Sequence, residues 1–260
     1  MNPHATLSDI LKSFQSGEIS LRDAEMAIHG LEIEEIGGIA HFDVGRHIRC
    51  GMPEVVLSEG KDPGHLTAIV TRVVEKSGRC IITRITGERY EVIRKAGRDH
   101  GYTVEEHRNA RIAIASRVPA PEKNHGVVGI ISAGTSDIPV AEEARIIAEE
   151  MGCTVHAIHD VGAAGIHRLF PALGKVQDAD VYIVVAGREG TLPTVVAGLV
   201  DRPVIGVPVS TGYGYMGAGE AALASMLQSC AVLAVVNIDA GFTAGAFAAQ
   251  VARGAQSNEK

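Results

Sequence analysis

From residue 127 onward the chain alternates short apolar runs with longer helical segments. The runs read VVGIISAG, TVHAIHD, VYIVVAG, PVIGVPVS and AVLAVVNID, and the segments between them include IPVAEEARIIAEEMG and TLPTVVAGLVD. Runs that are apolar at nearly every position are typical of strands buried on both faces, and alternation with helices favours a parallel sheet. The pattern predicts an α/β domain over 127–260, in which helices cover both faces of a parallel sheet in three αβα layers.

The first 118 residues have a more charged and mixed pattern. TLSDILKSFQSGEIS and LRDAEMAIHGLE carry apolar residues three or four apart, which predicts two short amphipathic helices. Farther on we expect a strand over 54–57, a helix from about Pro63, a helix near 90–96, and strands in CIITRI, GYTVEEH and ARIAIAS. This is a small α+β domain over 1–118, and the Pro-rich polar segment 119–126 is the expected linker.

Composition narrows the class of protein. Aromatic residues make up 4% of the chain and tryptophan is missing, which argues against an aromatic platform for nucleic acid. The formal net charge of -7 likewise predicts no nucleic-acid partner. Four scattered cysteines without C-x-x-C spacing are expected to stay reduced. Because there is no signal-peptide pattern and no long apolar run, we expect a cytoplasmic protein that does not span a membrane.

The residues that follow each apolar run are the candidates for a ligand site, because such sites lie beyond the carboxyl ends of parallel strands. After the first run, Ser132, Thr135 and Ser136 supply hydroxyl groups, and Asp137 opens a helix. Backbone N–H groups at a helix N-terminus, together with hydroxyl donors, form a phosphate cradle. An ordinary N-cap explains the same residues equally well, since Ser and Asp are favoured there.

Charged residues follow the second and third runs. Asp160 could bind a metal or orient a ligand, and His167 with Arg168 could meet a phosphate or donate a proton. A solvated loop explains these three residues just as well. Arg188 and Glu189 stand in a glycine loop after the third run, and we favour a functional role for this pair because of its place at a strand end.

The last two runs leave more alternatives open. Tyr213 and Tyr215 lie in a glycine-rich loop that either closes over a ligand or only connects two elements. Asp239 is interpreted as a helix cap. Cys230 precedes the fifth run, so topology places it at the amino end of the sheet, away from a ligand. Free cysteines are among the most buried residues, so local chemistry favours an inert thiol in the core.

Long motifs resemble the aminoimidazole-ribonucleotide carboxylase (PurE-like) family. They are GIISAGTSDIPVAEEA, VVAGREGTLPTVVAGLVDRPVIGVPVSTGYG and NIDAGFTAGAFAA, within roughly 125–252. The resemblance implies a PurE/flavodoxin-like three-layer domain and a homo-oligomer, usually an octamer. The segment HDVGAAGIHRLFP departs from the Ser-Ala-His-Arg-Thr-Pro segment that is typical of that family after the second strand.

Motifs along the entire chain resemble a second family, the LarB family of nickel-pincer cofactor biosynthesis, a pathway that serves lactate racemization. The motifs are HFDVGRHIRCGMPEVVLSEGKDPGHLTAIV, DVGAAGIHRLF, AGREGTLPTVVAGLVDRPVIGVPVSTGYG and LQSCAVLAVVNIDAGFTAG. This resemblance implies that the substrate is nicotinic acid adenine dinucleotide and that CO2 or bicarbonate is the co-substrate. The family carboxylates C5 of the pyridinium ring and hydrolyses the phosphoanhydride, which releases AMP and pyridinium-3,5-biscarboxylic acid mononucleotide.

The implied chemistry needs a nucleophile that is also a leaving group, and a cysteine thiolate is both. With the resemblance, Cys230 becomes the expected nucleophile. Its place before the strand then requires that the preceding helix ends near the site, that the strand begins later, or that a neighbouring subunit supplies the thiol. Glu189 is the expected base for the C5 proton or a metal-facing carboxylate, and Asp160 is the alternative for both roles. Hydrolysis of a phosphoanhydride favours Mg²⁺ with few protein ligands.

The remaining expected contacts concern the phosphates. Ser132, Thr135, Ser136 and the helix at Asp137 would hold one phosphate, and His167, Arg168 and Arg188 complete the set of candidate binding residues. In the N-terminal domain, Arg46, Arg49 and Lys61 either bind the second phosphate or the adenosine end, or form a solvated charged face. Two other functions stay open: a purine-type carboxylase or mutase, and a nucleotide-binding sensor without catalysis.

Overall fold

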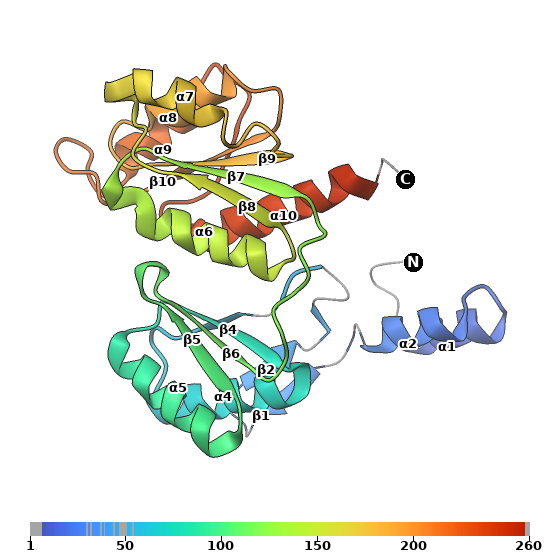
Figure 1. The fold of residues 1–260 in the computed structure, drawn as a ribbon. Coiled ribbons are helices and arrows are strands. Elements are labelled where there is room, and N and C mark those ends of the chain that lie inside the picture. The colour runs from blue at the N-terminus through green and yellow to red at the C-terminus, as the bar shows by residue number, and fades with distance from the viewer. Residues whose placement is uncertain are drawn as a thin grey trace. The chain divides into compact units, whose positions relative to one another are not determined.

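The computed structural model describes residues 7–29, 31, 33–36, 38, 40–43, 45–46, 51–53 and 55–257. The chain divides into two compact units, Met1–Pro119 and Ala120–Lys260 (Figure 1). Each unit has a sheet and helices of its own, and each is described separately below. No helix among the described residues is long and apolar enough to cross a lipid bilayer.

The C-terminal unit contains a five-stranded parallel sheet, as the apolar runs predict. Its strands, in spatial order, are β11 (Ala234–Val235), β10 (Val204–Pro208), β9 (Val181–Ala186), β7 (Val127–Ser132) and β8 (Thr154–Ile158). Numbered within the unit, this is the order 2-1-3-4-5 of flavodoxin-like sheets. The predicted three-layer PurE/flavodoxin-like fold is therefore confirmed. The direction of the strand order changes between β7 and β9, so two strand ends open a crevice there.

Helices cover both faces of this sheet (Figure 1). α6 (Ile138–Glu150) and α10 (Gly241–Ser257) lie on one face, and α7 (Leu169–Leu173), α8 (Thr191–Ala197) and α9 (Glu220–Leu227) lie on the other. α6 and α10 approach closely because small residues face each other: a Cβ on Gly245 would clash with the carbonyl oxygen of Ala144. Short 3-10 turns, η2 (Thr135–Asp137) and η3 (Ala163–Arg168), follow the ends of β7 and β8.

The core of the unit lies between the sheet and its helices. All residues of β9 and β10 are buried, and Leu169, Leu192 and Met226 bring the helices α7, α8 and α9 onto them. Full burial of a Leu or Met side chain contributes about 1.5–3 kcal/mol each, so this apolar interface is a substantial source of stability for the unit.

The fifth strand is shorter than its apolar run suggests. Only Ala234 and Val235 pair with β10, and Val232 is 94% exposed. On the carboxyl side of the strand, the carboxylate of Asp239 accepts a hydrogen bond from the backbone N–H of Ser210 at 2.9 Å. Asp239 therefore ties the ends of two strands together through its side chain. A turn precedes the strand and the Asp239–Ser210 hydrogen bond follows it. Between them, only two residues of the apolar run pair with β10.

The N-terminal unit consists of one layer of strands and one layer of helices. Its four-stranded sheet has the order β3 (Val55–Leu57), β4 (Arg79–Thr83), β6 (Ile112–Ser116) and β5 (Thr103–His107), in which only β3 and β4 are parallel. The helices α4 (Pro63–Ser77) and α5 (Gly87–His100) pack on it, and the short 3-10 turn η1 (Arg108–Ala110) connects β5 with β6. Local chemistry sets the ends of α4: the Asp62 side chain accepts hydrogen bonds from two backbone N–H groups, and Gly78 ends the helix with φ +77°.

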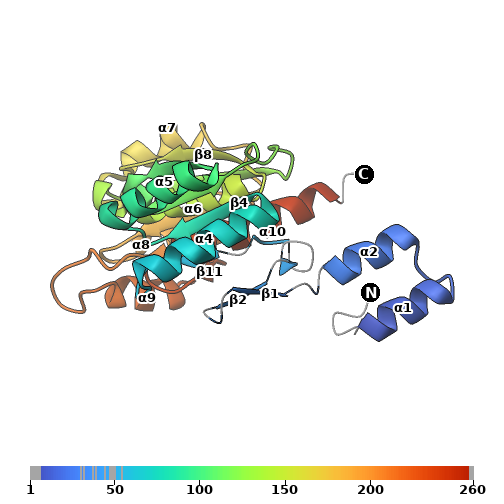
Figure 2. The ribbon, with the colours of Figure 1, turned by 90° about the horizontal axis from the view of Figure 1, so that it is seen from below.

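A pair of helices and a pair of strands precede this sheet. α1 (Leu7–Gln15) and α2 (Leu21–His29) form a helical hairpin (Figure 2), and the strands β1 (Ile33–Ile36) and β2 (Ala40–Asp43) pair antiparallel. The sequence interpretation included the two helices but not this pair of strands. The apolar residues Ile36 of β1 and Phe42 of β2 join the core of the unit. The position of this pair of strands therefore depends on packing with residues far away in the sequence.

Candidate functional site

A cavity of about 310 Å³ opens where the order of the parallel strands reverses. Residues from segments 133–137, 162–164, 186–192 and 211–213 line it, and these segments follow β7, β8, β9 and β10. All four lie at the carboxyl ends of the strands, the place at which open parallel sheets bind ligands. The cavity is therefore the candidate site of the C-terminal unit.

Glycines allow the loops around this cavity to come close together. A Cβ on Gly187 would lie 3.0 Å from the Asp137 carboxylate and 3.1 Å from the Thr211 hydroxyl. A Cβ on Gly212 would lie only 2.5 Å from the carbonyl oxygen of Gly187. Larger residues at either position would force the loops apart and change the shape of the cavity.

Asp137 supplies a buried carboxyl group to the cavity wall, with 4% of the residue exposed. Its Oδ2 accepts a hydrogen bond from the backbone N–H of Gly134 at 2.8 Å, and the Thr211 hydroxyl donates a second one. Burial raises the pKa of this carboxyl, and the two hydrogen bonds lower it only in part. Such a group can hold a ligand hydroxyl or carry a proton, which is a broader role than the phosphate cradle that the sequence suggests.

The other residues of the expected phosphate cradle are placed differently. Ser136 lines the cavity beside Asp137, whereas Thr135 is exposed and outside the lining. Ser132 is fully buried, and its hydroxyl forms a hydrogen bond of 2.9 Å with Nδ1 of His159. The Ser132 hydroxyl therefore does not face the cavity, and its partner is His159 rather than a ligand.

Arg188 and Glu189 both line the cavity, at the end of β9 where the sequence predicts a functional pair. Arg188 donates a hydrogen bond of 2.6 Å to the hydroxyl of Tyr213, and its guanidinium lies 4.4 Å from the centre of the same ring. Tyr213 also lines the cavity. The exposed carboxylate of Glu189 thus brings a negative charge to the cavity, and Arg188, which contacts Tyr213, brings a positive one.

The charged residues after β8 form a separate group. Arg168 donates a hydrogen bond of 2.8 Å to the carboxylate of Asp160, and both side chains are solvent-exposed. His167 is exposed in the same turn, and none of the three lines the cavity. The structure therefore brings Glu189 and Asp137 together in one cavity, while Asp160 is held by Arg168.

The expected metal pair, Asp160 and Glu189, has no supporting cluster. Within residues 55–257 and the shorter described segments before them, no group of three His, Cys, Asp or Glu side chains is arranged to hold a metal ion. A protein cage for Mg²⁺ does not fit the residues of this cavity. Any divalent ion there would depend mainly on ligands from the substrate.

Cys230 is exposed and lies between α9 and β11, before the strand, as the sequence topology indicates. It does not line the cavity. The neighbouring Ser229 hydroxyl accepts hydrogen bonds from the Thr194 hydroxyl of α8 at 2.9 Å and from the Ala231 N–H at 3.1 Å. These bonds fix the Cys230 turn to the flank of α8, the helix that begins at the cavity.

Two other described cysteines are buried. Burial raises the pKa of the Cys153 thiol to about 11, and it also raises the pKa of Cys80. Both thiols are therefore protonated at neutral pH and are poor nucleophiles. Cys50 lies outside the described residues.

Of the candidate residues in the N-terminal unit, the structure describes Arg46 and Lys61, and neither lines the cavity of the C-terminal unit. Arg46 and Lys61 are half-buried, and Arg49 lies outside the described residues. The backbone around Lys61 is held by Arg89, which donates a hydrogen bond of 2.8 Å to the Lys61 carbonyl oxygen and a second, shorter one to the Ser58 carbonyl oxygen. The interpretation of these residues as contacts for the adenosine end stays a prediction.

Sequence reasoning did not single out Thr211 and His159. Thr211 follows the fourth apolar run, so its place at a strand end was a usable signal. His159 stands near the end of the second run, directly after β8, but its partner Ser132 lies 27 residues earlier. Only the adjacency of β7 and β8 brings the two side chains together.

Comparisons with known proteins agree with both units. Residues 33–117 match the LarB/PurE-like N-terminal domain, and residues 127–259 match AIR carboxylase. An uncharacterized protein of Methanocaldococcus jannaschii is 44% identical over 252 residues, which cover 95% of this chain and 97% of that protein. The N5-carboxyaminoimidazole ribonucleotide mutase of the same organism is 34% identical over 129 residues, or 48% of this chain and 78% of the mutase.

A second mutase of that name, from Thermotoga maritima, is 34% identical over 90 residues, which cover 32% of this chain and 50% of the mutase. The mutases thus align with at most half of the chain, whereas the relative without an assigned activity aligns with nearly all of it. The resemblance to LarB is confirmed by the order of the two domains. The chain belongs to the AIR carboxylase family and carries, in front of that domain, the LarB/PurE-like N-terminal domain.

Proposed function

We propose that this protein is a nicotinic acid adenine dinucleotide carboxylase/hydrolase of nickel-pincer cofactor biosynthesis. The family makes it an enzyme of the carboxylase and mutase kind. The observation that carries the finer proposal is the LarB/PurE-like domain over 33–117, which stands in front of the AIR carboxylase domain. A purine-type mutase needs no such domain, since the mutase relatives align with at most half of this chain.

The proposed reaction begins with addition of a thiolate to the pyridinium ring. The addition converts the electron-poor ring into an enamine, whose C5 then forms a carbon–carbon bond with CO2. A base next removes the proton from C5, the electron pair of that C–H bond restores the aromatic ring, and the thiolate leaves. Glu189 is the proposed base because its carboxylate lines the cavity. Asp137 is a second carboxyl in the same cavity, and its raised pKa suits a role as proton carrier.

Cys230 is the proposed nucleophile, and its position outside the cavity of its own chain favours one of the three sequence alternatives. We propose that its thiol enters the cavity of a second copy in a homo-oligomer. The surface around it supports this proposal, since Leu227 is 66% exposed and Val232 is 94% exposed in the same segment. Apolar side chains of this kind are typical of surfaces that a partner covers.

Hydrolysis of the phosphoanhydride is the second part of the proposed reaction. Water attacks one phosphorus atom, the bridging P–O bond breaks, and AMP leaves with the bridging oxygen or with the oxygen of water. A volume of about 310 Å³ lies at the lower end of the usual range for ligand pockets, which suits one nucleotide rather than two. Ser136, Arg188 and the backbone N–H groups after β7 are the proposed phosphate contacts. Arg46, Arg49 and Lys61 remain candidates for the adenosine end.

The deciding experiment is incubation of the protein with nicotinic acid adenine dinucleotide, bicarbonate and Mg²⁺, followed by mass spectrometry. The proposal expects AMP together with a dicarboxylated mononucleotide, and unchanged dinucleotide contradicts it. A parallel reaction with aminoimidazole ribonucleotide tests the purine-type alternative. A third reaction with EDTA tests the proposed need for Mg²⁺. A protein that binds the dinucleotide without turnover, and whose binding is the same in Cys230→Ala, would instead be the sensor.

A further inference from the structure

A partly buried hydrogen bond joins two walls of the cavity from behind. Ser132 is the last residue of β7, His159 is the first residue after β8, and the Ser132 hydroxyl lies 2.9 Å from His159 Nδ1. Ser132 is fully buried, so loss of this partner would leave a buried hydroxyl group without it. The residues that immediately follow Ser132, and those that begin three positions after His159, line the cavity.

Two backbone features reinforce the same junction. The N–H of Val161 donates a hydrogen bond of 3.2 Å to the carbonyl oxygen of Ser132. A Cβ on Gly162 would lie 2.9 Å from the carbonyl oxygen of Ala133, so the two loops are in direct contact. The side-chain bond between Ser132 and His159 is thus part of a tight connection between wall segments 133–137 and 162–164.

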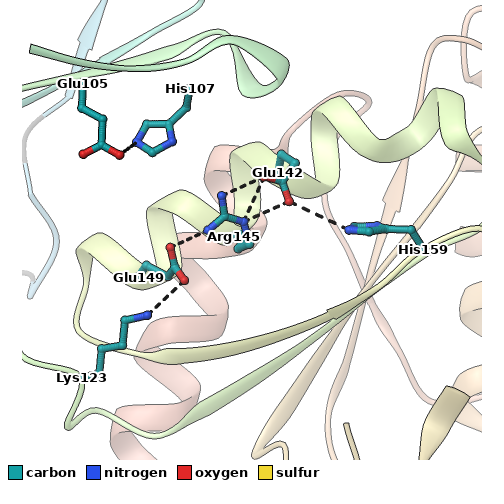
Figure 3. Close-up of polar contacts among 7 residues, drawn as sticks. All are labelled: Glu105, His107, Lys123, Glu142, Arg145, Glu149 and His159. Atoms are coloured by element: carbon teal, nitrogen blue, oxygen red, sulfur yellow. Dashed lines mark hydrogen bonds and ion pairs between the residues drawn. The ribbon is translucent and has the colours of Figure 1, made fainter. Parts of the chain in front are cut away.

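The other ring nitrogen of His159 faces a charged row on α6 (Figure 3). His159 Nε2 lies 4.0 Å from Oε1 of Glu142, which is an electrostatic rather than a hydrogen-bond distance. Arg145 holds that carboxylate in place, with hydrogen bonds of 3.0 Å from Nε and 2.8 Å from Nη2. The row continues from Arg145 to Glu149 at 2.7 Å and from Glu149 to Lys123 at 3.2 Å.

This arrangement favours one tautomer of the imidazole. The Glu142 carboxylate attracts the proton to Nε2, which leaves Nδ1 as the acceptor for the Ser132 hydroxyl. The ring is held between a helix on one side and a strand end on the other. Because α6 begins directly after Asp137, the same contacts also fix the first turns of the helix that follows the buried carboxyl.

We propose that His159 is a positioning residue of the cavity: through Ser132 and Glu142 it holds the Gly134–Asp137 wall in the shape that binds substrate. His159 does not line the cavity. The proposal rests on the proposed function for the identity of the ligand. His159 acts on the ligand indirectly, because it positions the Gly134 N–H and the Asp137 carboxyl.

The test compares five variants with the wild-type protein. His159→Leu removes the ring acceptor, and His159→Asn keeps an acceptor close to the place of Nδ1. His156→Leu is the matched control, because His156 lies on β8 three residues before His159, pairs with Asp178 at 3.3 Å and is not part of the cavity. The measured quantities are the dissociation constant for nicotinic acid adenine dinucleotide by calorimetry and hydrogen exchange of the Val161 amide without ligand.

The proposal expects about tenfold weaker binding in His159→Leu, the effect of one lost positioned polar contact. It also expects faster exchange at Val161 in that variant, and recovery of both properties in His159→Asn. Ser132→Ala should have the effect of His159→Leu, and the double variant should be no worse than either single variant. His156→Leu should bind like wild type.

The outcomes separate this inference from the proposed function. If the wild-type protein does not bind the dinucleotide, the proposed function fails, and the inference that rests on it fails too. If wild type binds and His159→Leu binds equally well, only the inference is overturned. Faster exchange in His159→Leu with unchanged affinity would make His159 a purely structural residue, which also overturns it. If His159→Leu does not fold, the comparison of His159→Asn with Ser132→Ala decides: the inference requires wild-type affinity in the former and weakened affinity in the latter.

Discussion

The carboxylate of Asp137 accepts a hydrogen bond from the backbone N–H of Gly134 at 2.8 Å, and this bond closes the loop that leads from β7 into α6. The Thr211 hydroxyl approaches the same carboxyl from the end of β10. One buried side chain thus connects the two loops that face each other across the cavity. Its protonation state bears on both the stability of the unit and its chemistry.

The stability of the protein should depend on pH through Asp137. Since burial raises the pKa of this carboxyl above its usual value of 3.8, the folded state binds a proton more readily than the unfolded state. The contribution of Asp137 to stability is therefore complete below its ordinary pKa and is lost as pH rises through the raised value. Thermal melts of wild type and Asp137→Asn should show that wild type gains stability relative to the variant as pH falls from about 7 toward 4.

Thr211→Val tests whether the pH dependence of stability comes from Asp137. The Thr211 hydroxyl lowers the pKa of Asp137, so its removal should move the pH dependence to higher pH. A difference between wild type and Asp137→Asn that is constant over this pH range would contradict a raised pKa. The expected effect on turnover is separate: if Asp137 carries a proton, Asp137→Asn should bind substrate and lose activity.

Arg188 should affect affinity more than stability. Its stacking on Tyr213 is solvent-exposed, and an exposed cation–π contact contributes only about 0.5–1 kcal/mol. Arg188→Lys keeps the positive charge but loses the planar group that can pair with a phosphate. We expect a change in the melting temperature of only a few degrees and about tenfold weaker binding of the dinucleotide, measured by calorimetry.

Tyr213→Phe separates the two contacts of Arg188. The variant loses the hydrogen bond of 2.6 Å to the tyrosine hydroxyl but keeps the ring beneath the guanidinium. Affinity close to that of wild type would assign the role to stacking, whereas a loss equal to that of Arg188→Lys would assign it to the hydrogen bond. Unchanged affinity in Arg188→Lys itself would remove Arg188 from the binding site.

Thiol chemistry should distinguish Cys230 from the other described cysteines. Cys230 is exposed, whereas Cys80 and Cys153 are buried and have raised pKa values. In a Cys50→Ser background, iodoacetamide should label Cys230 in the native protein and should reach Cys80 and Cys153 only after addition of denaturant. Mass spectrometry of peptides identifies the labelled site, and Cys230→Ser is the control. Native labelling of Cys80 at a rate equal to that of Cys230 would contradict the structure.

The sheet and the edge at which the cavity lies could be predicted because both depend on local patterns. Fully apolar runs such as the one at Val181–Ala186 indicate strands buried on two faces, and the site of a parallel sheet follows from strand direction alone. The pairing of Ser132 with His159 could not be predicted from local patterns. The flavodoxin-like resemblance implies that the first two strands are neighbours, but the contact between these two side chains is a tertiary property that no local pattern encodes.

The position of Cys230 shows where local reasoning and family resemblance disagree. Topology places the thiol at the amino end of the sheet, and the structure agrees with that placement. The buried inert thiol that local chemistry alone favours is not observed, since Cys230 is exposed, and its expected role as the nucleophile stays a prediction. The short fifth strand explains this difference: pairing begins only at Ala234, so the preceding apolar residues stay outside the sheet.

A mixing experiment tests whether Cys230 serves the cavity of another copy. Cys230→Ala lacks the proposed nucleophile, and Glu189→Gln lacks the proposed base, so each variant alone should lose at least about a hundredfold in carboxylation. In an oligomer that contains both, a cavity with its own Glu189 and a partner's intact Cys230 is complete.

With equal amounts of the two chains and random assembly, about a quarter of the cavities should be complete, so activity should return to about a quarter of the wild-type value. Co-expression of the two chains with different affinity tags, followed by two purification steps, yields the mixed oligomer. The control combines Cys230→Ala with a chain that carries both substitutions, which leaves every cavity without a thiol. Activity in the first mixture but not in the second supports a shared site. Equal inactivity of both mixtures, together with active wild type, would place the thiol and the carboxylate of each cavity on the same chain.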